Sequence, residues 1–332
     1  MSALLRLGVL ALDGCLLSSL GGPIDALRIA ERIAQLRQPR EQPRFVSYVL
    51  NARGRSEVAS ASGVGLTGVV TDTPEIDVLL VPGAMGEHPR GLLDAATLQP
   101  EIEYIRAMHA RGVRIAASCS GTILLARTGL LDGRRATTSW WLGAQFRQHF
   151  PKVKLDIDQI LVEDERIITT GAATAILNLV VRLIGEVAGQ ELASQVGRML
   201  VIDSERQSQA PYVSMALIER PRTSLAEKAE RVLRRTLDKD ISVALLAEQC
   251  DTSERNLLRH FKAHYGCSPL EYIQRLRVER AKALLETTHL GFDEVVERCG
   301  YRDTSSFRKL FKRATSLTPN DYRERFRLRA RH

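Results

Sequence analysis

The sequence predicts two structural regions, an α/β region built on a mainly parallel sheet and an all-helical region that follows it. Short apolar segments alternate with helical patterns in the residues before position 205. The net charge of +8 lies entirely in residues 221–332, which contain 24 Lys and Arg against 16 Asp and Glu. In this last third, three residues return after 50 positions: Phe261, Pro269 and Tyr272 recur as Phe311, Pro319 and Tyr322.

The composition limits the class of protein. A chain of 332 residues with 44% hydrophobic residues can form two domains, each with its own core. The five cysteines form no CxxC pattern and no metal-ligand spacing, so we expect reduced thiols in the cytoplasm, without a metal or cofactor. No apolar run reaches the roughly 20 residues of a membrane span, and residues 1–12 indicate a first core strand rather than a signal peptide.

The elements of the α/β region follow from the apolar periodicity. We expect strands at 6–12, 45–50, 77–81, 113–117 and 166–170, and helices at 23–36, 100–110, from 120 onward and at 173–188. Pro23 suits the first turn of its helix, because a first-turn residue needs no N–H donor. The predicted domains are 1–205, a linker at 206–224, and 225–332, in which the linker is rich in Gln, Ser and Pro.

The 50-residue repeat indicates two helix-turn-helix units. In the first unit, residues 243–250 form a support helix, and Ser253 caps a second helix on which Leu257 and Phe261 share the core face. In the second unit, residues 292–299 form the support helix, and Phe307 and Phe311 are the matching core pair. A helix at 272–286 connects the units and can hold them at the spacing of successive major grooves, about 34 Å.

The remaining faces of the two second helices carry side chains that suit DNA. Arg and Asn recognise guanine and adenine edges in the major groove, and other polar groups hold phosphates. The basic charge of this region independently indicates a polyanionic partner. The candidate DNA-binding residues are Arg255, Asn256, Arg259, Ser305, Ser306, Arg308 and Lys309.

These motifs resemble the AraC/XylS family of transcription regulators. The resemblance covers about residues 225–330 and is carried by the stretches Ser253-Glu-Arg-Asn-Leu-Leu-Arg-His-Phe-Lys262, Ser268-Pro-Leu-Glu-Tyr272, 276–285 and 299–311. It implies sequence-specific binding to promoter DNA and contact with RNA polymerase.

The sharpest feature of the α/β region is an elbow at Cys119. An apolar strand ends at residues 115–117, the chain turns at Cys119, and a helix starts with the small residues Ser120 and Gly121. Helix N–H groups behind the thiol would lower its pKa and form an anion hole. A buried, inert cysteine is the alternative interpretation of the same pattern.

The α/β region resembles the PfpI-like, glutamine-amidotransferase-like domain that precedes the helix-turn-helix region in GlxA-type regulators. The matching stretches include Gly22-Pro-Ile-Asp25, Leu80-Val-Pro-Gly-Ala84, the elbow and 129–140. The resemblance implies a flavodoxin-like parallel-sheet sandwich in which Cys119 holds the nucleophile position and Asp25 that of a carboxylate. Ser139 stands where a histidine is common, and Asn178 where an aspartate is usual. Without that base we predict no catalytic residue; His88, His109 and His149 lie outside the motif.

We predict instead that the strand ends bind a small-molecule effector, in a pocket lined by Asp25, Gly83, Cys119, Ser120, Ser139 and Trp140. Trp140 and Trp141 either face a cation or form one core and one surface residue. The main hypothesis is a homodimeric, effector-responsive transcription regulator. Two alternatives remain open: a cysteine-dependent hydrolase or amidotransferase-like enzyme, and a thiol redox sensor that uses Cys119, with Cys15 nearby.

Overall fold

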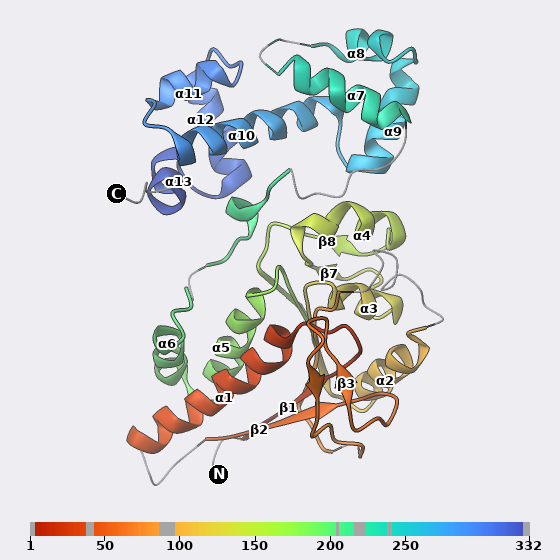
Figure 1. Cartoon of the computed structure of the whole chain (residues 1–332), viewed down its shortest axis with the longest axis vertical. Coiled ribbons are helices and arrows are strands. Elements are labelled where there is room, and N and C mark those ends of the chain that lie inside the picture. The colour runs from red at the N-terminus through yellow and green to blue at the C-terminus, as the bar shows by residue number, and fades with distance from the viewer. Residues whose placement is uncertain are drawn as a thin grey trace. The chain divides into compact units, whose positions relative to one another are not determined.

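The computed structural model describes all residues except 1–3, 38–42, 73, 86–96, 204–205, 216–223, 238, 240 and 328–332 (Figure 1). The chain forms two compact units that part between Gln209 and Ala210. The first unit is an α/β sandwich and the second is helical, as the sequence predicts.

The first unit is organised around one six-stranded sheet with the strand order β2-β1-β5-β6-β10-β9. All neighbouring pairs are parallel except β9 and β10. The strands are β1 Leu4–Leu10, β2 Arg44–Leu50, β5 Val78–Val81, β6 Arg114–Ser118, β9 Leu161–Asp164 and β10 Ile167–Thr170. Two small ribbons pair β3 Val58–Ala59 with β4 Gly65–Leu66, and β7 Arg135–Ala136 with β8 Lys154–Leu155.

Helices cover both faces of this sheet (Figure 1). On one side α1 Leu17–Arg37, α5 Ala175–Ala188 and α6 Gln190–Met199 pack together. On the other side α2 Gln99–Ala110 packs against α3 Gly121–Arg127, and α4 Gly143–His149 follows in the chain. Because they are covered on both faces, β5 and β10 are buried at every residue, which explains the continuous apolar sequence of β5; β10 instead ends in two buried threonines.

The first helix differs from the prediction. It begins at Leu17, six residues before Pro23, and Pro23 lies inside the helix rather than in its first turn. The buried residues Leu20, Leu27 and Ala34 recur every seven positions, so the helical period extends upstream of the proline. Burial of this longer stripe offsets the backbone hydrogen bond that Pro23 cannot donate.

The second unit contains seven helices in the described residues. They are α7 Ser224–Arg235, α8 Val243–Gln249, α9 Glu254–Tyr265, α10 Pro269–Thr287, α11 Phe292–Arg298, α12 Thr304–Thr315 and α13 Pro319–Phe326. The bounds of α9 and α12 differ by 50 positions at both ends, which confirms the repeat. From Cys299 to the N-cap Asp303 the second turn is one residue longer than the first, which runs from Cys250 to Ser253.

Each helix-turn-helix unit has its own core, and α10 contributes to both. Leu257 and Phe261 lie in the first core with Leu276 of α10. Phe307 and Phe311 lie in the second core with Val278 of α10. The four side chains that α9 and α12 contribute to these cores are fully buried; we call α9 and α12 the reader helices. The connecting helix is therefore a shared structural element and not a spacer.

The repeat extends to the caps. Ser268 and Thr318 each cap a helix that begins with proline, and each forms a reciprocal capping box, with Glu271 and Asp321 respectively. The α9 and α12 helices both end in a left-handed residue, Gly266 and its counterpart Ser316.

The described part of the expected linker packs onto the two units. The side chain of Gln209 is buried in the first unit, where its Nε2 donates to the Thr138 carbonyl at 2.8 Å and its Oε1 accepts from the Ala172 amide at 3.1 Å. In the second unit, the Tyr212 ring meets the Phe326 ring edge-on with 5.3 Å between centroids. Residues 216–223 lie outside the described residues.

We expect Thr318→Ala to lower the free energy of unfolding of the helical unit by about 1 kcal/mol, because the Asp321 amide loses its cap. Thr287→Ala is the control, since the Thr287 hydroxyl only bonds the carbonyl of Ala283, one turn earlier in its own helix. Urea unfolding followed by circular dichroism measures both. Equal midpoints for Thr318→Ala and the wild-type chain would contradict the assignment of Thr318 as a cap.

Candidate functional site

The Cys119 elbow lies where β6 ends and α3 begins. Cys119 adopts a left-handed backbone conformation with φ 57°, which is strained for a side chain other than glycine. Its amide is held by the carbonyls of Thr170 and Gly171, both at 3.1 Å, at the end of the neighbouring β10. The strand-turn-helix geometry predicted for Cys119 is therefore present.

Two glycines allow the end of β5 to approach the elbow. A Cβ atom on Gly121 would lie 2.4 Å from the carbonyl oxygen of Pro82, and one on Gly83 would lie 3.1 Å from the Cβ of Cys119. The Ser120 hydroxyl joins the same segments, because it accepts from the Ala84 amide at 2.9 Å and donates to the Ala84 carbonyl at 2.7 Å. Gly83, Cys119 and Ser120 are thus brought together, as the sequence predicts.

The predicted site residue Ser139 contacts the thiol directly. Its hydroxyl donates to Sγ of Cys119 at 2.9 Å, and the neighbouring Thr138 hydroxyl donates to the Cys119 carbonyl at 2.7 Å. Ser139 is completely buried. It therefore occupies the place of a base beside the thiol, but a hydroxyl group cannot take up the thiol proton near neutral pH.

The predicted direction of the Cys119 pKa shift is wrong. Burial raises the pKa of the Cys119 thiol, and the hydrogen bonds from Ser139 and Ser120 only partly counteract that effect. Only 4% of the residue is exposed, so the thiolate would lose nearly all of its hydration. The following helix α3 has seven residues, and its N-terminus does not outweigh this desolvation.

The other catalytic candidates lie apart from the thiol or outside the described residues. Asp25 is exposed on α1 and makes no hydrogen bond to the elbow in the described part of the chain. His109 and His149 belong to α2 and α4, and neither bonds Cys119, while His88 lies outside the described residues. Asn178 donates from Nδ2 to the Asp203 carbonyl at 2.9 Å.

The tryptophan pair forms one core residue and one partly exposed residue. Trp140 is buried directly after Ser139, and Trp141 meets it edge-on with 5.2 Å between ring centroids. This arrangement matches the second of the two interpretations of the pair. Within the described residues, no Lys or Arg side chain lies over the ring of Trp140 or Trp141.

Sequence reasoning missed a group of buried hydroxyls near the elbow. Ser118, Thr122 and Thr170 have hydroxyl oxygens without a hydrogen-bond partner among the described residues, and all three are fully buried. Ser118 precedes Cys119, and Thr170 lies opposite Ser118 in the β6–β10 register. Ser19 of α1 is a fourth such residue, one turn after Leu16, whose amide donates to the Gly83 carbonyl. Only the serine and threonine content signalled these residues.

The second candidate site is formed by the outer faces of α9 and α12. Six of the predicted DNA-binding side chains are exposed and Asn256 is half-buried. Arg255 and Lys309 make no hydrogen bond or ion pair within the described part of the chain. The six exposed side chains are those of Arg255, Arg259, Ser305, Ser306, Arg308 and Lys309.

The remaining side chains on these faces interact with one another. Asn256 bridges its unit, donating to the Thr252 hydroxyl at 2.9 Å and accepting from Arg259 at 2.7 Å. In the second unit the Ser306 hydroxyl donates to the N-cap Asp303 at 2.6 Å, and the Arg308 guanidinium lies 4.8 Å from the Phe292 ring centroid. These contacts orient polar groups at the N-terminal half of each helix, the part that a helix-turn-helix places against base edges.

None of the described helices combines the length and the apolar character that a bilayer span demands.

Comparison with known families agrees with both halves of the structure. Residues 246–325 match a model described as a helix-turn-helix domain, and residues 46–186 match the DJ-1/PfpI family. The first match contains both reader helices, and the second contains the elbow.

Curated relatives share this combination. The chain is 27% identical over 324 residues to the HTH-type transcriptional regulator GbdR of Pseudomonas aeruginosa, covering 96% of this chain and 84% of the relative. It is also 27% identical to the HTH-type transcriptional regulator GlxA of Rhizobium meliloti, covering 96% of each. An isonitrile hydratase of Pseudomonas putida is 28% identical over 194 residues, which cover 52% of this chain and 78% of that protein.

Solved structures agree on the fold. A ThiJ/PfpI family protein from Pseudomonas syringae superposes with a TM-score of 0.50 at 21% identity, covering 76% of this chain and 90% of that one. A putative transcriptional regulator protein from Vibrio parahaemolyticus also gives 0.50, covering 59% and 98%. The two family matches and the nearly full-length relatives, together with the repeat, the capped helices and the elbow, show that the chain combines an N-terminal DJ-1/PfpI domain with an AraC-type helix-turn-helix domain.

Proposed function

We propose that this protein is a homodimeric transcription regulator that reads promoter DNA with α9 and α12, binds a small polar effector near the Cys119 elbow, and acts on RNA polymerase at the promoter. The observation that carries the proposal is the duplicated reader. Two helices of equal length, each with a buried core pair and an exposed polar face, are held by the shared helix α10. The full-length relatives named as regulators support the same function.

The chemistry of the elbow favours a polar effector. An unpaired hydroxyl in a protein interior costs about 1–3 kcal/mol. Ser118, Thr122 and Thr170 are three such groups: the first two lie within three residues of Cys119, and the carbonyl of Thr170 accepts from the Cys119 amide. A small molecule with hydrogen-bonding groups would offset this cost, whereas an apolar molecule would not. We therefore propose an effector that carries amide, hydroxyl, carboxylate or ammonium groups.

Gln209 joins the elbow, through hydrogen bonds, to the backbone segment that leads into the helical unit. Its side chain bonds the Thr138 carbonyl and the Ala172 amide, and Thr138 in turn bonds the Cys119 carbonyl. The packing is close, because a Cβ on Gly171 would lie 2.6 Å from Oε1 of Gln209. The residue that follows, Ala210, begins the segment that belongs to the helical unit.

That segment is held on the helical side by α10. The Lys282 ammonium donates to the Val213 carbonyl, and the Met215 amide donates to Glu279 at 3.0 Å. A conformational change in the loops around Cys119 would thus alter the hydrogen bonds of Gln209. Because the segment after Gln209 is bonded to α10, the change would also reach the helix that both helix-turn-helix units share.

A second candidate function is hydrolysis or hydration by Cys119, and its support is the similarity of the first unit to an isonitrile hydratase. The elbow geometry favours it, but the raised pKa of the thiol and the Ser139 contact oppose it. We propose that Cys119 does not support turnover. The third hypothesis, redox sensing, has a similar difficulty: Cys119 and Cys15 are both buried, and burial raises the pKa of both thiols.

Arg255→Ala and Lys309→Ala are expected to weaken binding to a promoter fragment by about 1–3 kcal/mol each, or roughly 5- to 150-fold, if they contact bases or phosphates as proposed. Arg198→Ala, which removes an exposed arginine from α6 of the first unit, is the control and should leave affinity unchanged. Electrophoretic mobility shifts at several salt concentrations measure the effect. Wild-type binding that is equally weak for every sequence would refute promoter reading.

Gln209→Ala should loosen both ends of the proposed route, because the Ala172 amide and the Thr138 carbonyl lose their partner, at a cost of about 2–3 kcal/mol. Hydrogen–deuterium exchange of the full chain should then quicken at residues 117–122 and at 210–215. The control Gln195→Ala removes only a surface contact with Glu191. Faster exchange confined to residues 206–209 would show that Gln209 is a local anchor only.

The thiol of Cys119 should react slowly with iodoacetamide at pH 7.5, and its rate should still be rising above pH 9, because only the thiolate reacts and burial raises the thiol pKa. Mass spectrometry resolves Cys119 from the other four cysteines. The same cysteine in guanidinium-unfolded protein is the control, with the ordinary pKa. A rate that levels off below pH 8 would reveal an activated thiolate and revive the enzyme hypothesis.

A further inference from the structure

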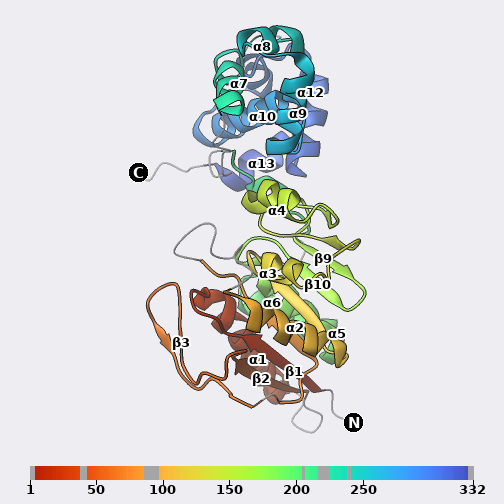
Figure 2. The same ribbon diagram turned by 90° about the vertical axis from the view of Figure 1, so that its right-hand side faces the viewer.

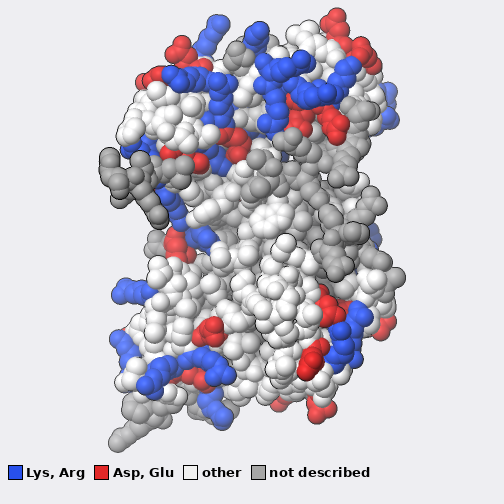
Figure 3. All heavy atoms as spheres, in the orientation of Figure 1, with Lys and Arg blue, Asp and Glu red and all other residues white. Residues whose placement is uncertain are grey.

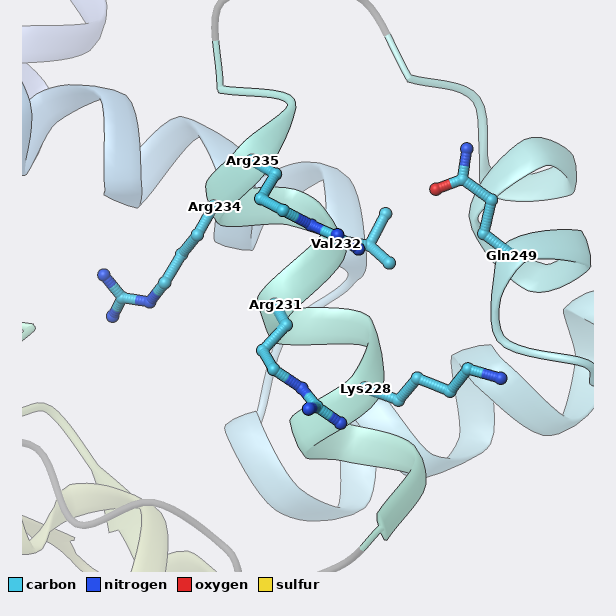
Figure 4. A pocket seen from close by; sticks show the side chains of 6 residues that line it. All are labelled: Lys228, Arg231, Val232, Arg234, Arg235 and Gln249. Carbon is cyan, nitrogen blue, oxygen red and sulfur yellow. The ribbon is translucent and has the colours of Figure 1, made fainter.

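A basic hollow lies on the helical unit, between α7 and the end of α8. It encloses about 500 Å³ and is lined by Lys228, Arg231, Val232, Arg234, Arg235 and Gln249. Figure 4 shows these side chains spaced along α7, with Gln249 across from them on α8. Figure 3 shows Lys and Arg gathered on this part of the surface.

The charges in the hollow are only partly neutralised by the protein. Lys228 pairs with Asp251, and Arg234 pairs with Glu230 at 2.8 Å. Arg231 and Arg235 are exposed one turn apart on α7 and have no carboxylate within 4.0 Å in the described part of the chain. Two like charges at this spacing disfavour the helix by a few tenths of a kcal/mol. An anionic partner would remove that repulsion.

A second hollow continues the first, and it adds apolar surface. It encloses about 290 Å³, shares Arg234 with the first hollow, and is lined also by Met215, Leu237, Leu276, Glu279 and Arg280. Arg280 is exposed and adds a further guanidinium to the rim, while Met215 and Leu276 are buried beneath. A surface with arginines at the rim and methionine and leucine at the floor has the composition of a protein interface.

The residues that line the first hollow belong to α7 and α8, and not to the DNA-reading helices α9 and α12. In Figure 2, α7 lies on one side of α10, and the reader helices α9 and α12 lie on the other. Arg231 and Arg235 are thus on a helix that is separate from α9 and α12, while Lys228 of the same hollow pairs with Asp251 in the turn before α9. The apolar residues of the second hollow favour a protein partner, because a phosphate backbone has no apolar group to pack against Leu276.

We propose that this surface, the two hollows along α7, docks an acidic segment of a partner protein, whose carboxylates pair with Arg231, Arg235 and Arg280 while an apolar side chain packs on Val232, Met215 or Leu276. Guanidinium groups pair with carboxylates through two parallel hydrogen bonds, which gives such docking its selectivity. The proposal deepens the proposed function, because it names the chemistry by which the DNA-bound protein would engage a protein partner, and it does not depend on the effector.

The test uses the full chain, free and bound to a promoter fragment, and a fluorescent peptide of alternating Glu and Leu as the probe. A twin peptide with Gln in place of Glu is the ligand control. Fluorescence anisotropy measures both. We expect Arg231→Glu with Arg235→Glu to weaken binding of the acidic peptide at least tenfold and to change promoter affinity less than threefold. The matched control is Arg28→Glu with Arg32→Glu, two exposed arginines at the same spacing on α1.

Three outcomes would overturn the proposal. Unchanged peptide affinity, or an equal loss in the α1 control, would show that the hollows do not dock the peptide. A tenfold loss of promoter affinity would instead assign Arg231 and Arg235 to DNA phosphates. If charge reversal unfolds the protein, peptide binding is measured with the milder variant Arg231→Gln with Arg235→Gln instead. Failure of the wild-type chain to bind any promoter would sink the proposed function, yet the peptide titration of the free chain would still decide this proposal.

Discussion

Both DNA-reading units depend on one helix. Residues of α10 complete the first core through Leu276 and the second through Val278, so neither core closes without it. Its 19 residues extend about 28 Å, and its start is fixed by the Ser268 capping box. Because a packed core tolerates little displacement, α9 and α12 are held in one geometry by the packing of α10. The geometry in which α9 and α12 are presented is thus set by a buried apolar stripe of α10.

The elbow combines a strand-turn-helix geometry with surroundings that disfavour the thiolate of Cys119. The left-handed backbone at Cys119 costs about 1–3 kcal/mol, and the tight packing of Gly83 and Gly121 around it leaves no room for a side chain. In an enzyme this strain would serve to present an ionised nucleophile. Here the same packing removes water from the thiol, and Ser139 supplies a hydrogen bond where a proton acceptor would be needed. Geometry exposes the end of β6 to the turn, whereas desolvation raises the pKa of the thiol that the turn carries.

The sequence predicted the layers, the duplicated unit and the elbow, because each depends on local pattern: period-two and continuous apolar strands, core pairs four residues apart, and small residues after a strand. It failed where tertiary packing decides. The start of α1 was placed too late because Pro23 was taken as a boundary, while the buried stripe carries the helix past it. Asp25 matched a motif but is exposed, whereas Ser19, six residues earlier, is buried. The sign of the Cys119 shift required the depth of burial, which no motif encodes.

The sequence placed Arg206-Gln-Ser-Gln209 both in the resemblance to the PfpI-like domain and at the start of the expected linker, but it did not reveal the buried contacts of Gln209. The energetics of these contacts set a limit on the coupling between the two units. Coupling between sites in regulators is commonly about 1–3 kcal/mol. A net hydrogen bond contributes about 0.5–1.5 kcal/mol. The Gln209 side chain makes bonds to the Thr138 carbonyl and the Ala172 amide, and its amide donates to the Asp158 carbonyl. An effector that alters one or two of these bonds would therefore supply coupling of the usual size, without any rearrangement of the sheet or of the reader cores.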